Sequence, residues 1–139
     1  MASKKLECHF SGKNLDKKDT FGKSDPYLVI SKLTDDEGGI MEICRTDVIK
    51  KTLDPKWEPV CVVFESGRGA DVQVKISCYD YDVAKQDDLI GEFYTSLFEM
   101  IKAETSRLEW NLINPKKFQE IVNYKNSGVI VLSQVNVLQ

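Results

Sequence analysis

The chain has 139 residues, of which 42% are hydrophobic and 29% are charged, and these values are typical of one globular domain with a substantial core. The composition excludes intrinsic disorder, and a formal net charge of −3 excludes strong unspecific attraction to nucleic acid or to an anionic membrane. We therefore expect a single domain over residues 1–139, a monomer with no nucleic-acid partner.

Apolar residues alternate with polar ones along most of the chain. Leu6, Cys8 and Phe10 begin this pattern, and it returns at residues 72–78 and 108–112. Further β-rich runs occupy residues 26–33, 40–49, 59–65, 88–94 and 128–138. The sequence thus predicts an all-β domain, an eight-stranded antiparallel β-sandwich.

One segment departs from the two-residue period. Leu97, Met100 and Ile101 have helical spacing, and Ser96 and Glu99 stand where a capping box begins a helix. This pattern predicts one short crossover helix over about residues 97–103. A polar connection starting at residues 114–117 leads to the last strand.

Two loops that are remote in the sequence carry clustered carboxylates. Residues 16–26 join the first two strands, and residues 79–88 join the fifth and sixth. If both loops emerge at one end of the sandwich, their carboxylates repel one another unless a hard cation takes their oxygens. The candidate ligands are Asp19, Asp25, Asp80, Asp82 and Asp88.

Calcium is the cation that this donor set favours. It accepts about six to eight oxygens in irregular geometry, whereas magnesium demands a tighter octahedron, and zinc would want the His or Cys that both loops lack. An EF-hand starting at Asp80 fails, because Lys85 stands at the glycine position and Gly91 at the final glutamate position. The alternative is that both loops are solvated turns whose carboxylates cap their own backbone.

Four short motifs occur in order over about seventy residues: GKSDPY at 22–27, KTLDPKW at 51–57, YDYD at 79–82 and DLIGE at 88–92. Together they resemble the C2 domain, the calcium-dependent phospholipid-binding β-sandwich. Residues 10–19, 91–93, 114–117 and 126–128 are most similar to the second C2 domain of copines. The resemblance spans nearly the whole chain.

The resemblance implies a site, residue by residue. It places the calcium ligands on the five aspartates above and on the backbone oxygens of Lys18 and Tyr81, with Asp87 as a spectator charge. It also implies the permuted, type II strand order. The expected membrane-contacting residues are Phe21, Val83, Ala84 and Lys85, and the expected lipid-headgroup contacts are Arg45, Lys50 and Lys51.

The function that follows is that of a binding module. Two bound calcium ions would offset most of the negative charge of the loops and change the net charge of the chain from −3 to +1. They would thereby recruit a cytoplasmic protein reversibly to anionic phospholipid membranes, with phosphatidylserine as the expected lipid. The alternative is a calcium-independent domain of the same fold that binds protein partners. Catalysis is not expected, because the chain has one histidine, His9, and none of the common hydrolase, P-loop or zinc-protease motifs.

Overall fold

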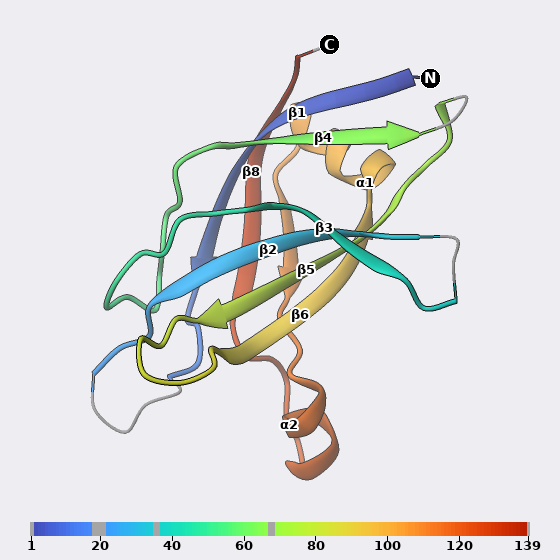
Figure 1. Cartoon of the computed structure of the whole chain (residues 1–139). Coiled ribbons are helices and arrows are strands. Elements are labelled where there is room, and N and C mark those ends of the chain that lie inside the picture. Colours follow the sequence, from blue (N-terminus) through green and yellow to red (C-terminus); the bar gives the residue numbers. More distant parts are fainter. Residues whose placement is uncertain (1, 18–21, 35–36, 67–68, 139) are drawn as a thin grey trace.

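The computed structural model describes residues 2–17, 22–34, 37–66 and 69–138. Its strands are β1 (Ala2–Lys13), β2 (Pro26–Leu33), β3 (Ile40–Arg45), β4 (Val60–Ser66), β5 (Gln73–Asp80), β6 (Asp88–Ser96), β7 (Leu108–Asn111) and β8 (Val129–Val137). They form two four-stranded antiparallel sheets, in the orders β4-β1-β8-β7 and β3-β2-β5-β6 (Figure 1). The predicted eight-stranded β-sandwich is confirmed.

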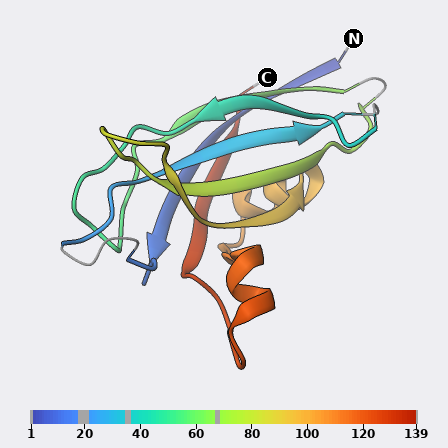
Figure 2. The same cartoon turned by 60° about the horizontal axis from the view of Figure 1, so that its bottom comes forward.

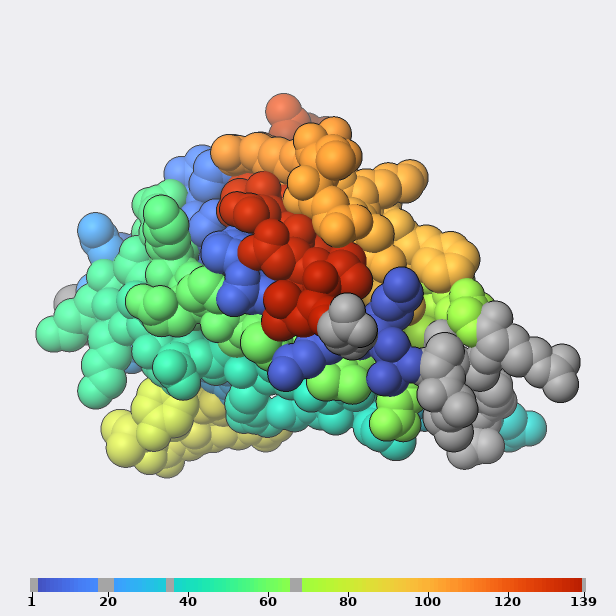
Figure 3. All heavy atoms as spheres, turned by 90° about the horizontal axis from the view of Figure 1, so that it is seen from above, coloured from blue at the N-terminus to red at the C-terminus, as the bar shows by residue number. Residues whose placement is uncertain are grey.

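The strand order puts the two ends of the chain together. β1 lies between β4 and β8, and Leu138 donates its backbone N–H to the Lys5 carbonyl oxygen at 2.8 Å. Figure 3 shows β8 in red between β1 in blue and the segment of β7 in orange. The opposite end carries the loops after β1, β3 and β5 (Figures 1 and 2). As expected from the resemblance, β1 leads into the first acidic loop and two strands follow the helix.

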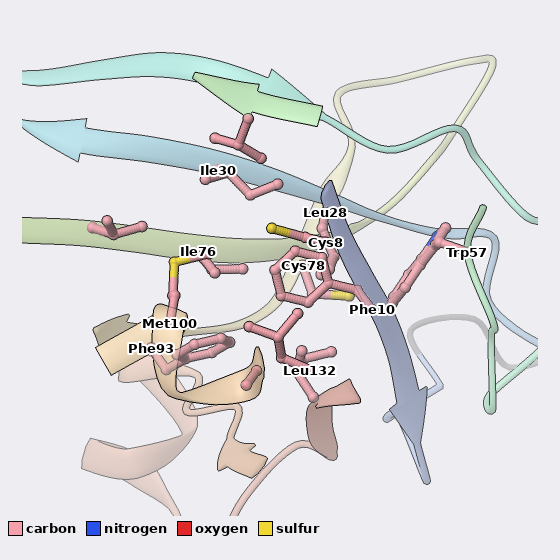
Figure 4. Packing of buried hydrophobic residues seen from close by; sticks show 14 of the residues in the cluster. Cys8, Phe10, Leu28, Ile30, Trp57, Ile76, Cys78, Phe93, Met100 and Leu132 are labelled. Carbon is pink, nitrogen blue, oxygen red and sulfur yellow. The ribbon is translucent and has the colours of Figure 1, made fainter. Parts of the chain in front are cut away.

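The core lies between the two sheets and is built from the alternating residues. Leu6, Cys8 and Phe10 of β1 are 0–2% exposed and belong to the same buried cluster as Ile30 and Ile76 of the other sheet. Figure 4 shows Cys8 and Phe10 within this cluster. Each fully buried side chain of this size contributes roughly 1.5–3 kcal/mol through the hydrophobic effect. Every second residue of β1 from Leu6 to Phe10 is thereby committed to the core.

Trp57 closes the core toward the loops. It is 4% exposed, and its indole N–H donates to the Pro26 carbonyl oxygen at 3.2 Å. Figure 4 shows it next to Phe10, whose carbonyl accepts the Trp57 backbone N–H. The TLDPKW motif therefore serves packing at the base of the loops.

The crossover helix is present as α1 (Leu97–Ile101), continued by the 3-10 turn η2 (Lys102–Glu104). Ser96 caps it by accepting the Glu99 N–H at 3.1 Å, as predicted. A second helix, α2 (Pro115–Glu120), occupies the connection for which the sequence predicted only a polar segment. Its signal was the Asn-Pro pair, because Asn114 caps the helix and Pro115 begins it. Within the described ranges, no helix is long and apolar enough to cross a membrane.

Candidate functional site: the acidic loop end

Strand register brings the two acidic loops together. Asp80 is the last residue of β5, where it lies opposite Pro26 of β2 on one side and opposite Asp88 of β6 on the other. Asp25 directly precedes β2. Because β5 lies between β2 and β6, aspartates about sixty residues apart in sequence meet at one end of this sheet (Figures 1 and 2).

Asp25 and Asp80 connect three loops through backbone hydrogen bonds. Asp80 is 5% exposed, and its Oδ1 accepts the Asp25 N–H at 2.9 Å. Asp25 accepts the Tyr81 N–H through its carbonyl at 3.0 Å and the Lys51 N–H through its Oδ1 at 2.7 Å. The first acidic loop, the 46–59 loop and the 81–87 loop are therefore tied at their bases.

The 81–87 loop is organised by two further carboxylates. Asp82 Oδ1 accepts the N–H groups of Ala84 at 2.8 Å and Lys85 at 3.2 Å, a turn that aspartate favours. Asp82 in turn donates its own N–H to Asp87 Oδ1 at 2.8 Å. The carboxylate of Asp82 is thus held at a fixed place in the loop.

Asp87 anchors this loop to the sheet, although the resemblance implied only a spectator charge. Its Oδ2 accepts the hydroxyl of Tyr27 at 2.5 Å. Burial, followed by the bond to Asp87, raises the pKa of Tyr27 above its ordinary value, which keeps the phenol neutral as a donor. No local pattern could reveal this contact, because the two residues are sixty positions apart.

Aromatic and basic groups surround the Tyr27 ring. Tyr79 stacks on it with ring centroids 5.7 Å apart, and the Arg45 guanidinium lies 5.7 Å from its centroid. Arg45 also makes two hydrogen bonds of 2.7 Å to the Glu42 carboxylate. Arg45, an expected headgroup contact, is therefore already paired with an acid.

The remaining expected contacts are on the surface. Val83 is 89% exposed, and Ala84 and Lys85 are exposed beside it at the tip of the loop. Lys50 and Lys51 are exposed on the neighbouring 46–59 loop. The expected calcium ligands Lys18 and Asp19 and the expected membrane contact Phe21 lie outside the described residues.

The donor chemistry fits calcium, since the described candidates Asp25, Asp80, Asp82 and Asp88 offer only oxygen. Across the ranges that the structure describes, however, no three Asp, Glu, His or Cys side chains are arranged to hold a metal ion. Asp25, Asp80 and Asp82 accept backbone N–H groups instead. The calcium ligand set stays a prediction.

Comparison with known proteins decides the family. The model of the C2 domain family matches residues 4–113. The chain belongs to the C2 domain family. Its copine-like segments remain a resemblance of sequence.

Solved C2 domains share the fold of this one. A structure named BON1-C2B is 27% identical, with a TM-score of 0.75 over 99% of this chain and 93% of that chain. The calcium-bound structure of the C2A and C2B domains of Extended-Synaptotagmin 2 is 26% identical, with a TM-score of 0.59 over 93% of this chain and 45% of that chain. The C2A domain of plant Extended Synaptotagmin 1 is 23% identical, with a TM-score of 0.66 over 98% of this chain and 92% of that chain, and shows the fold alone.

Proposed function

We propose that this C2 domain binds anionic phospholipid membranes when calcium occupies its acidic loop end. The observation that carries the proposal is the strand register, which places Asp80 opposite Asp88. Asp80 is also close to Asp25, whose backbone N–H donates to the Asp80 carboxylate. Three carboxylates at one end of a sheet repel one another, and a divalent cation relieves that repulsion. The structure of the C2A and C2B domains of Extended-Synaptotagmin 2, part of which is similar to this chain, is calcium-bound, and this supports the proposal.

The residues that would hold calcium come from both acidic loops. They are the side chains of Asp19, Asp25, Asp80, Asp82 and Asp88 and the backbone oxygens of Lys18 and Tyr81. When bound, the ion supplies positive charge and coordination positions for phosphate or carboxylate oxygens of lipid. The backbone hydrogen bonds of Asp80 and Asp82 hold these side chains at the loop end in advance, which lowers the entropy lost on binding.

Charge explains why binding would depend on calcium. The chain has a net charge of −3, and two ions of charge +2 would bring it to +1. An anionic membrane surface repels the first state near the acidic loops and attracts the second. The exposed Val83, with Phe21 from the other loop, would then enter the interface as an apolar contact. We propose phosphatidylserine as the lipid and reversible recruitment from the cytoplasm as the consequence.

Cosedimentation with vesicles tests the proposal. Vesicles with and without phosphatidylserine are compared, each with calcium or with excess chelator. The test variant is Asp80→Asn/Asp82→Asn, and the matched control is Glu65→Gln/Glu104→Gln, which removes the same charge from two exposed residues outside the acidic loops. A melting curve in chelator establishes that both variants fold.

The expected result is pelleting that requires both calcium and phosphatidylserine, is lost in the aspartate variant and is kept in the control. Equal pelleting in chelator, or calcium-dependent pelleting by the aspartate variant, would contradict the proposal. Absence of any pelleting by the wild-type domain would instead favour a domain that binds protein partners.

A further inference from the structure

The connection between β7 and β8, residues 112–128, lies at the acidic loop end of the sandwich (Figures 1 and 2). The register requires this, because Val129 at the start of β8 lies opposite Lys13 at the end of β1. Two contacts join the connection to the first acidic loop: the Lys117 ammonium lies 2.8 Å from Asp16 Oδ2, and the Asp16 N–H donates to the Ser127 carbonyl at 3.0 Å. The α2 helix is therefore a neighbour of the proposed membrane-facing loops.

The connection is also tied to the strand that follows the second acidic loop. Asn114, 7% exposed, donates its side-chain amide to the Leu89 carbonyl at 3.1 Å and to the Ile90 carbonyl at 3.4 Å. Its backbone N–H donates to the Tyr124 hydroxyl at 2.9 Å, and that hydroxyl lies 2.5 Å from Ser127 Oγ. Hydrogen bonds at both ends thus fix the position of α2 relative to both acidic loops.

This fixed element presents apolar side chains to solvent. Phe118 is 67% exposed, Ile121 48% and Val122 86%, and α2 itself contains no buried residue. Phe118 also borders a groove of about 440 Å³ in which Tyr94 is another exposed ring. Large apolar residues that cluster on a surface usually mark an interaction site.

The charge of the same segment indicates what that site contacts. Residues 115–125 hold three lysines and one glutamate, although the whole chain has a net charge of −3. Lys117 is paired with Asp16, whereas Lys116 and Lys125 are exposed next to the apolar residues. Exposed lysines beside Phe, Ile and Val form the composition that lies at the interface of an anionic bilayer.

We propose that this patch, made of Lys116, Phe118, Ile121, Val122 and Lys125, is a second membrane-contacting surface that binds anionic lipid together with the calcium-loaded loops. The inference rests on the proposed function. Its occupant is an anionic bilayer, because the patch is basic and adjoins the loops that would meet that bilayer. The patch would add affinity and restrict the tilt of the domain, because a second contact apart from the loops limits how the domain can rotate on the membrane.

Phe98 provides a matched control. It is 51% exposed and belongs to α1. Figure 1 shows α1 away from the acidic loops and near the end with the chain termini. The experiment titrates wild type, Phe118→Ala and Phe98→Ala with phosphatidylserine-containing vesicles at saturating calcium. We expect about tenfold weaker binding for Phe118→Ala and less than a twofold change for Phe98→Ala. Calcium binding without vesicles should be the same in all three.

Fluorescence gives a direct readout of contact. The native Trp57 and Trp110 supply a constant background of fluorescence. Brominated lipid tails should quench the tryptophan fluorescence added by Phe118→Trp, but not the fluorescence added by Phe98→Trp. Equal vesicle affinity of Phe118→Ala and wild type, or equal quenching of the two probes, would overturn the second surface while leaving the calcium-dependent function intact. Failure of the wild-type domain to bind these vesicles would overturn both.

Discussion

Replacing Tyr27 by Phe tests whether the Tyr27–Asp87 contact anchors the 81–87 loop. The change removes a single oxygen, so the ring can still stack on Tyr79 and lie beneath Arg45. The lost interaction is a hydrogen bond of 2.5 Å to a carboxylate. Hydrogen bonds to charged groups contribute about 1.5–3 kcal/mol to the free energy of unfolding. Because Asp87 is only half-buried, water can replace part of the lost interaction in the variant. We expect the free energy of unfolding to fall by about 1.5 kcal/mol.

Urea denaturation followed by circular dichroism measures this change, with Tyr94→Phe as the control. Tyr94 is 57% exposed, and its hydroxyl should contribute less than about 0.5 kcal/mol. The pH dependence gives an independent check. The pKa of Tyr27 is raised in the folded state, so the unfolded chain ionises first, and the contribution of Tyr27 is complete below about pH 10 and is lost as pH rises above it.

Tyr27→Phe should therefore lose less stability between about pH 10 and pH 11 than the wild type. It should also weaken calcium binding, since Asp87 holds the backbone of Asp82. A free energy of unfolding within about 0.3 kcal/mol of wild type, combined with an unchanged pH slope, would refute the reasoning.

Two further substitutions test the packing behind the site. Gly128→Ala should lower the free energy of unfolding by about 3 kcal/mol, because Gly128 has a φ of +122° and a Cβ there would lie 2.9 Å from Leu15 Cα and 3.1 Å from the Asn14 oxygen. The control Gly38→Ala has open space around the new Cβ and should lower the free energy of unfolding by only about 1 kcal/mol. Thermal melts that show no larger loss of stability for Gly128→Ala than for this control would contradict the crowding argument. Cys8→Ala should reduce the loss of stability above about pH 9, because burial raises the pKa of the Cys8 thiol to about 12 and the unfolded thiol ionises first. Urea denaturation under reducing conditions at pH 8 to pH 11 measures it, and equal slopes for variant and wild type would count against this assignment.

The alternation of apolar and polar residues is by itself sufficient to predict the strands and the class of fold. Leu6, Cys8 and Phe10 can all be buried only if the segment is extended, so the local pattern and the final structure agree there. The same holds for α1, where Ser96 caps the first turn as its spacing indicates. Capping and period are local interactions, and a sequence shows them directly.

The partners of the acidic residues depend on which strands become neighbours. Asp80 meets Asp25 and Asp88 because β5 lies between β2 and β6, and Asp87 meets Tyr27 for the same reason. The sequence supplies these side chains and their clustering in two loops, and a family resemblance suggests their role. Their actual hydrogen bonds follow from strand register, which is a property of the whole sheet.

The α2 surface shows the same division. Asn114 and Pro115 predict the start of a helix from the sequence alone. The exposure of Phe118 and Val122 cannot be predicted in this way, because an apolar residue in a short helix is usually expected in the core. These side chains stay outside because hydrogen bonds from Asn114 and the Lys117–Asp16 ion pair hold α2 at the loop end of the sandwich. The order of apolar, polar and acidic residues along the chain therefore determines that this protein is a β-sandwich with acidic loops, and tertiary packing alone decides which surfaces lie beside those loops.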